Sequence, residues 1–138
     1  MNAITLTHYP ENSPAAMLRV IAMFILSDGE VADGEMEAVD GLNILGFLGG
    51  DRPLFAEVLT RYCDDLIAYA GDHQTVNLVD QAWLDAVFAP ITAADKQRLL
   101  ARALLLIARA DGYFADAELV VVKQALTRWN LELDDLAE

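Results

Sequence analysis

The sequence predicts an all-α protein of six to seven helices, and three observations lead to this fold class. Apolar residues recur at three- and four-residue steps along most of the chain. Residues that start and end helices separate these runs at short intervals. No segment bounded by turn residues alternates apolar and polar positions, as a half-buried strand would. Because the 138 residues contain no Pro- or Ser-rich linker, we expect one helical domain over 1–138.

The first half of the chain opens with the most apolar of the expected helices. Residues 14–27 are apolar on nearly every side, so this helix should be central and buried. Ser13 provides its N-cap and Pro14 its first position. Asp28–Gly29 end it, because glycine readily adopts the left-handed conformation that closes a helix. A second helix is expected over 33–46.

Two further helices are expected in the middle of the chain. The Gly-rich stretch 46–53 interrupts the helical pattern, and Asp51 within it caps a helix that runs to about Ala70. Residues 77–88 again carry apolar side chains at three- and four-residue steps. Pro90 stops this helix, since proline cannot continue it.

The last two substantial helices repeat the pattern of the first two. Thr92 and Asp95 form a near capping box at the start of a long apolar helix over 93–110. The final helix covers 116–130 and ends at Asn130, and a short turn completes the chain.

An acidic motif occurs twice at an offset of 83 residues. Residues 28–35 read DGEVADGE and residues 111–118 read DGYFADAE, and five of the eight letters agree. The match extends into the preceding helices, where Arg19 aligns with Arg102. The apolar positions Ile21, Met23 and Phe24 align in the same way with Leu104, Leu106 and Ile107. A unit of helix, acidic turn and helix used twice predicts two pseudo-symmetric helical hairpins around two central apolar helices.

The repeated acids are candidate metal ligands. Hard divalent cations such as Ca²⁺ take roughly six to eight oxygen ligands, many of them carboxylates. An EF-hand is excluded, because Ala32 and Asp33 occupy the positions where its loop needs an acid and a glycine. The candidate ligands are Asp28, Glu30, Asp33 and Glu35 in the first turn and Asp111, Asp116 and Glu118 in the second.

The same carboxylates also have a purely structural interpretation. Asp33 and Asp116 are at N-cap positions, and the Glu two residues after each complements the helix dipole by about 0.3–1 kcal/mol. Asp28 and Asp111 instead follow the end of a helix, where negative charge is disfavoured. Either the turn carries each of them to the next helix N-terminus, or a cation offsets the charge. The sequence leaves both interpretations open.

The charge balance restricts the classes of partner. Acidic residues outnumber basic ones by 22 to 9, giving a net charge of −13. Such a surface repels nucleic-acid phosphates and anionic lipid headgroups, and suits cations or a protein partner with a basic surface. No apolar run is long enough to insert into a membrane and the N-terminus lacks a signal-peptide pattern, so we expect a cytoplasmic protein of undetermined oligomeric state.

No catalytic constellation is apparent, so the sequence predicts a protein that is not an enzyme. His8 and His73 fall in predicted loops without zinc-site spacing. Cys63 precedes two aspartates that disfavour a thiolate, and both tryptophans are expected in the core. Arg19 interrupts an apolar helix and should either reach the surface or pair with an acid.

The repeated Ala- or Ser-Asp-Gly turn, followed by Asp-x-Glu opening another helix, resembles the TerB-like tellurite-resistance domain. The resemblance covers roughly residues 9–131, including YPENSP at 9–14 and WNL at 129–131. It implies about seven helices in two pseudo-symmetric halves, metal binding by the acidic residues, and a role in resistance to tellurite and other chemical stress. It implies no catalytic activity. The alternative is an acidic adaptor that docks a basic protein partner without metal.

Overall fold

The computed structural model describes residues 6–25, 44–70, 81–111 and 116–132, which form six α-helices and contain no strand. The predicted all-α fold class is therefore confirmed, while the pseudo-symmetric pairing of two hairpins stays a prediction. No helix in these ranges combines the length and apolar character needed to span a membrane. The helices are α1 (Pro14–Ile25), α3 (Ile44–Phe47), α4 (Arg52–Ala70), α5 (Gln81–Phe88), α6 (Ala94–Asp111) and α7 (Asp116–Arg128).

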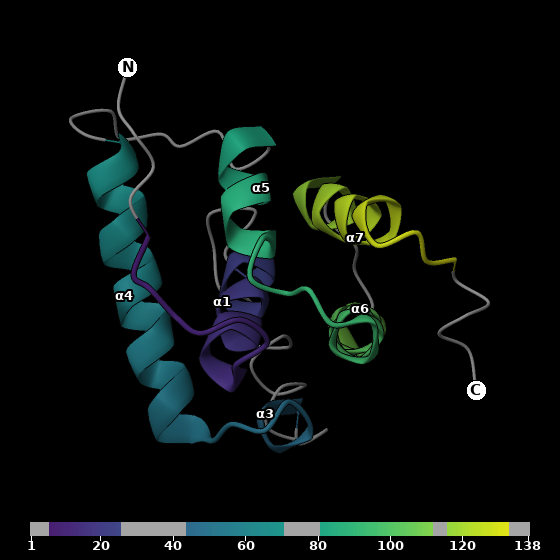
Figure 1. Cartoon of the computed structure of the whole chain (residues 1–138), viewed down its shortest axis with the longest axis horizontal. Helices are drawn as coiled ribbons and strands as arrows, with labels where there is room; N and C mark the ends of the chain where they lie inside the picture. The colour runs from purple at the N-terminus through teal and green to yellow at the C-terminus, as the bar shows by residue number, and fades with distance from the viewer. Residues whose placement is uncertain (1–5, 26–43, 71–80, 112–115, 133–138) are drawn as a thin grey trace.

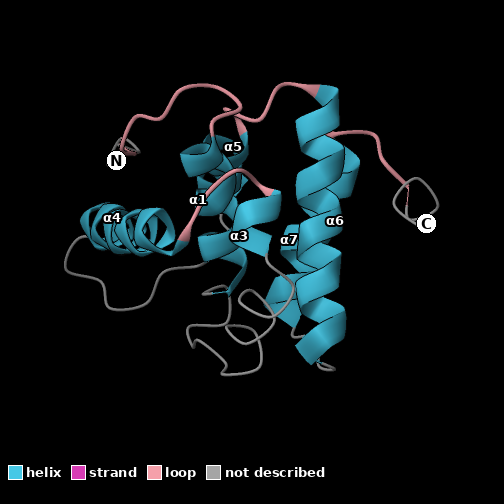
Figure 2. Cartoon of the chain, turned by 90° about the horizontal axis from the view of Figure 1, so that it is seen from below, coloured by secondary structure: helices cyan, strands magenta, loops and turns pink. Residues whose placement is uncertain are grey.

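Helix α1 is the centre of the described structure. Every residue from Ala16 to Ile25 is at most 2% exposed. Helix α4 lies on one side of α1, and α6 and α7 lie on the other, as two perpendicular views show (Figures 1 and 2). These helices and α5 all contact α1. The predicted central, buried helix is confirmed over the described residues 14–25.

Helix α6 buries only one of its faces. Leu100, Leu104 and Ile107 are fully buried, whereas Asp95 and Arg98 are exposed. Its main neighbours among the described helices are α1 and α7, so it lies at the edge of the structure (Figure 1). The expectation of a second central helix over 93–110 is thus met on one face only, because no described helix covers the other.

Local sequence signals set the predicted starts of α1 and α4. The Oγ of Ser13 accepts a hydrogen bond from the Ala16 amide at 3.2 Å. The Oδ1 of Asp51 accepts one from the Leu54 amide at 2.9 Å. Each side chain satisfies one of the amides that has no partner inside its helix. Both predicted N-caps are confirmed.

The ends of α3 and α7 share a left-handed closing residue. Gly49 has φ 85° and Asn130 has φ 53°, values that glycine and asparagine adopt more easily than other residues. In each case the next amide donates to the carbonyl five residues earlier, at 2.7 Å for Gly50 and 2.9 Å for Leu131. This pattern is the Schellman motif. Asn130 closes the last helix as predicted, although the helix itself ends two residues earlier, at Arg128.

The start of α6 is held by a residue from the other end of the fold. Asn12 donates its amide to the Pro90 carbonyl at 2.9 Å. Its Oδ1 accepts from the amides of Thr92 at 2.9 Å and Ala93 at 2.8 Å, while its Nδ2 donates to the Thr92 Oγ1 at 2.9 Å. Asn12 therefore caps this helix start, where the sequence predicted a near capping box between Thr92 and Asp95. The Nε2 of Gln97 adds a bond to the Ile91 carbonyl at 2.9 Å.

Aromatic contacts join the covering helices. Trp83 is fully buried and donates its Nε1 hydrogen to the Tyr62 hydroxyl at 3.1 Å, while its ring stacks on Tyr69 with centroids 5.0 Å apart. Trp129 is 9% exposed and meets Phe88 edge-on at 5.3 Å. The prediction that both tryptophans belong to the core is confirmed.

Candidate functional site

The predicted metal ligands lie mostly beyond what the structure describes. The first turn falls outside the described residues. In the second turn, the structure describes the backbone of Asp111, Asp116 and Glu118 as parts of helices α6 and α7. Among the described side chains, no group of three or more His, Cys, Asp or Glu residues is arranged to hold a metal ion. The site therefore stays a prediction for Asp28, Glu30, Asp33, Glu35, Asp111, Asp116 and Glu118.

The helices on either side of the second turn begin and end where the repeat predicts. Helix α6 ends at Asp111 and α7 begins at Asp116. The carboxylate residue Asp116 thus lies at a helix N-terminus, where the backbone amides favour negative charge. Asp111 lies at a helix C-terminus, where negative charge is disfavoured. The second turn therefore keeps the electrostatic conflict that the sequence identified.

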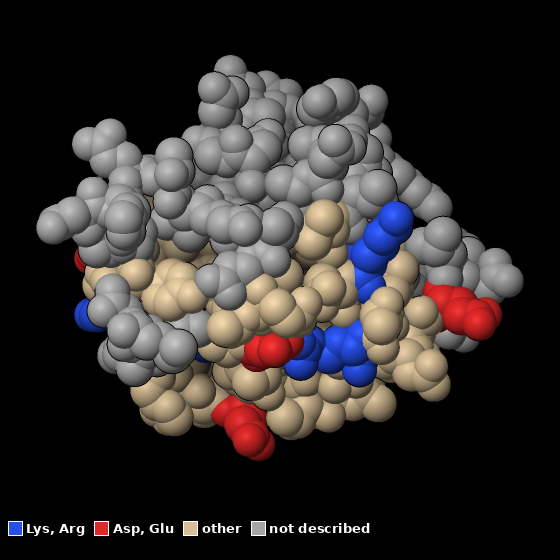
Figure 3. Space-filling model, turned by 90° about the horizontal axis from the view of Figure 1, so that it is seen from above, with Lys and Arg blue, Asp and Glu red and all other residues tan. Residues whose placement is uncertain are grey.

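Charge is divided unevenly between the described side chains and the remainder of the chain. The described side chains include eight acids and eight bases. On the face shown in Figure 3, both kinds are present, and an acidic group lies beside basic ones near the centre of the view. The remaining residues carry fourteen acids and one base, and thus the whole net charge of −13. The two turn segments, 28–40 and 111–118, contain nine acids and no base.

A buried arginine lies in the middle of α1. Arg19 is 2% exposed, and its Nη1 donates to the Thr7 carbonyl at 2.6 Å. The guanidinium carbon lies 4.8 Å from the centre of the Tyr9 ring, within cation–π range. Its buried Nε has no hydrogen-bond partner. Arg19 therefore neither reaches the surface nor forms an ion pair with a described acid, contrary to the two roles expected from the sequence.

Thr7 connects this cation to an acid on α4. The Thr7 amide donates to Asp65 Oδ2 at 2.9 Å, and its hydroxyl donates to Asp65 Oδ1 at 3.4 Å. Burial lowers the pKa of Arg19, while the negative charge of Asp65 acts in the opposite direction. An arginine nevertheless stays protonated in proteins. The charges of Arg19 and Asp65 thus influence each other through Thr7, which is hydrogen-bonded to both side chains.

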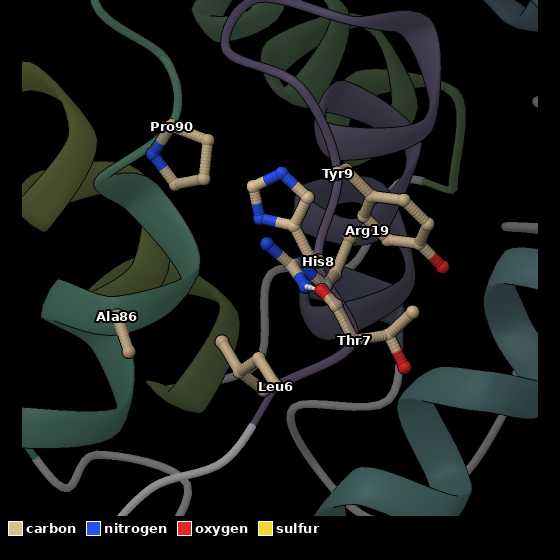
Figure 4. Close-up of a pocket in the computed structure, with 7 residues that line it drawn as sticks. All are labelled: Leu6, Thr7, His8, Tyr9, Arg19, Ala86 and Pro90. Carbon is tan, nitrogen blue, oxygen red and sulfur yellow. Dashed lines mark hydrogen bonds between the residues drawn. The ribbon is translucent and has the colours of Figure 1, made fainter.

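A pocket of about 260 Å³ opens beside the Arg19 guanidinium (Figure 4). One wall is the segment before α1, and the opposite wall is α5 with Pro90, two residues after its end. This pocket is not predicted from the sequence, where its one signal is the lone Arg19 in an apolar helix. The lining residues are Leu6, Thr7, His8, Tyr9, Arg19, Ala86 and Pro90.

The described histidine and cysteine show no sign of nucleophilic chemistry. His8 is exposed in the segment before α1, in the loop position predicted for it, and His73 lies outside the described residues. Cys63 is partly buried on α4, and this burial raises the pKa of its thiol, with a further increase from Asp64. The thiolate is thus disfavoured, in the direction that the sequence predicted.

Comparison of the chain with models of known protein families, with curated proteins and with solved structures finds no match. The resemblance to the TerB-like domain thus rests on the sequence motifs alone. Its functional implications stay predictions.

Proposed function

We propose that this protein is a non-enzymatic cation-binding module that holds a divalent ion such as Ca²⁺ at its two acidic turns. The charge partition supports this proposal most directly. Nine acids and no base occupy the two turn segments, whereas the described side chains are electrically balanced. Concentrated carboxylates produce the local negative potential and the oxygen donors that hard cations require.

The first turn should bind the ion more tightly than the second. Residues 28–40 contain six acids, against three in residues 111–118. More carboxylates give both more ligands and a stronger field, which raises affinity at sites for hard cations. The TerB-like resemblance supports a role for such a module in resistance to tellurite and other chemical stress.

Calorimetric titration of chelator-stripped protein with Ca²⁺, Mg²⁺ and Zn²⁺ tests the proposal. We expect saturable heat with at least one ion, and its loss in the Asp28→Asn/Asp111→Asn double variant. A matched control, Asp64→Asn/Asp95→Asn, removes the same charge from exposed positions on α4 and α6. Equal losses in the two double variants would indicate a general charge effect. Silence with every ion would reject the metal site.

An acidic adaptor that docks a basic protein partner is the second candidate. The same concentration of acids in two short segments supports it, because electrostatic complementarity steers association. Binding of a Lys- or Arg-rich partner that survives chelation and weakens steeply with salt would favour the adaptor. Partner binding that requires the divalent ion would instead favour the cation-binding module.

A further inference from the structure

The Arg19 pocket has the chemistry of a small anion site, independent of the acidic turns. A buried cation is costly unless a counter-charge or a full set of hydrogen bonds compensates it. Arg19 has one bond to a carbonyl and a cation–π contact with Tyr9, but its Nε is buried without a partner. Asp65, the described acid whose charge acts on Arg19, accepts its hydrogen bonds from Thr7 instead. The guanidinium therefore keeps unused capacity to donate to an anion.

The residues that line the pocket indicate what an anion bound there must look like beyond its charged group. Figure 4 shows the Arg19 guanidinium reaching into the space between His8 and Leu6, with Ala86 and Pro90 on the opposite side. Apart from the arginine, the walls combine the apolar side chains of Leu6, Ala86 and Pro90 with the more polar residues Thr7, His8 and Tyr9. Ligand pockets usually measure about 300–1,000 Å³, so a volume of about 260 Å³ suits only a small molecule.

We propose that this pocket binds a small monocarboxylate with a short apolar tail. A planar guanidinium matches a carboxylate well, and a hydrogen bond between two ionised groups is stronger than a neutral one. The net charge of −13 repels a doubly charged phosphate more strongly than a singly charged carboxylate. The carboxylate lies against Arg19, while the tail lies along Leu6 and Ala86.

Butyrate titration followed by the NMR shift of the Arg19 side-chain N–H group tests this site. We expect saturable shifts with a Kd of about 1 mM or weaker, which is typical of so few contacts. Butyramide has the same shape without the charge and should bind at least about tenfold more weakly. Inorganic phosphate should also bind more weakly than butyrate. Equal binding of butyrate and butyramide would overturn the proposal.

Two variants locate the binding. Arg19→Gln removes the charge and keeps a side-chain donor, so butyrate affinity, followed here by the backbone amide shifts of Thr7 and Ala86, should fall about tenfold or more. Ala86→Phe fills the pocket from α5 and should abolish the shifts without touching the arginine. Ala94→Phe adds the same ring to an exposed position on α6 and should leave affinity unchanged. Butyrate binding that survives Ala86→Phe, or no saturable binding to the unmodified protein, contradicts the site.

The outcome is separable from the cation proposal. The pocket attracts the opposite charge and contains none of the turn carboxylates. The Asp28→Asn/Asp111→Asn variant should therefore keep butyrate binding, and Ala86→Phe should keep cation binding. Either site can fail while the other stands.

Discussion

Helices α1 and α6 are the matched members of the sequence repeat, yet their surroundings differ. Helix α1 is buried at every position from Ala16 to Ile25, while α6 exposes Asp95 and Arg98. Their arginines differ as well. Arg19 is 2% exposed, whereas its counterpart Arg102 is half-buried. The same repeated unit therefore supplies both a central helix and an edge helix.

The difference shows that neighbours, as well as local hydrophobicity, determine burial. Helix α1 contacts α4, α5, α6 and α7, whereas the main described neighbours of α6 are α1 and α7. A repeated sequence motif can be kept while the helices that carry it adapt to unequal packing, because turn chemistry is local and core packing is not.

Replacing Met23 and its repeat counterpart Leu106 by alanine should give the largest difference in stability between the two helices. Met23 is fully buried, and its repeat counterpart Leu106 is only partly buried. Met23→Ala should lower the free energy of unfolding by about 2–5 kcal/mol through lost burial and a cavity. Leu106→Ala should cost about 1 kcal/mol, because solvent already reaches that side chain. Urea denaturation measures both, and equal losses would contradict the central-versus-edge distinction.

Alkaline pH should lower the free energy of unfolding through Tyr62, a buried residue of α4. Burial raises the pKa of Tyr62 to about 12, from 10.0 in the unfolded chain. The folded state thus holds this proton more tightly, so its stabilisation is complete below pH 10 and is lost as pH rises toward 12. The expected loss is about 3 kcal/mol, at about 1.36 kcal/mol per pKa unit. Denaturation curves across this range measure it, and Tyr62→Phe, which lacks the proton, should remove most of the slope.

Removal of the Asn12 side chain should selectively weaken the start of α6. Asn12→Ala deletes the acceptor for two amides and places alanine at φ 59°, for an expected cost of about 2–3 kcal/mol. Asn12→Gly loses the same bonds without the backbone strain and should cost about 1 kcal/mol less.

Hydrogen exchange can locate the effect of Asn12→Ala. The Thr92 and Ala93 amides should lose protection, while the Ala16 amide, which Ser13 caps, stays protected. Equal loss of protection at all these amides would contradict a local role for the Asn12 hydrogen bonds.

A small effect is expected where α3 closes against α1. A Cβ added to Gly50 would lie 2.7 Å from Leu18 Cδ1, so Leu18 would have to shift within a filled core. Because the clash involves the end of a side chain, Gly50→Ala should cost about 1 kcal/mol. Leu131 holds the equivalent position after α7, where a large side chain is accommodated. An unchanged Tm for Gly50→Ala would indicate looser packing around α1.

Local chemistry made much of this fold predictable. Ser13, Asp51 and Asn130 act on amides or carbonyls within a few residues, so the sequence was sufficient to identify them. Asn12 caps a helix about 80 residues away, and no local pattern encodes that contact. The Arg19 pocket is formed by α1, α5 and the leading segment, so its existence depends on the tertiary arrangement.

For the acidic turns, the sequence predicts which residues matter but not what they do. Their spacing predicts ligands, but capping and metal binding use the same carboxylates at the same helix ends. Sequence spacing alone cannot separate these roles, since both require oxygen atoms near free amides or a cation.

The thermal stability of chelator-stripped protein with and without Ca²⁺ tests the cation proposal most directly. With free ion at about 100 times Kd, binding to the folded state alone adds about 2.7 kcal/mol and should raise Tm by about 8 °C. The Asp28→Asn/Asp111→Asn variant should show no rise, while Asp64→Asn/Asp95→Asn should match the unmodified protein. If Ca²⁺, Mg²⁺ and Zn²⁺ all leave Tm unchanged, the repeated carboxylates serve as helix caps, and the metal site does not exist.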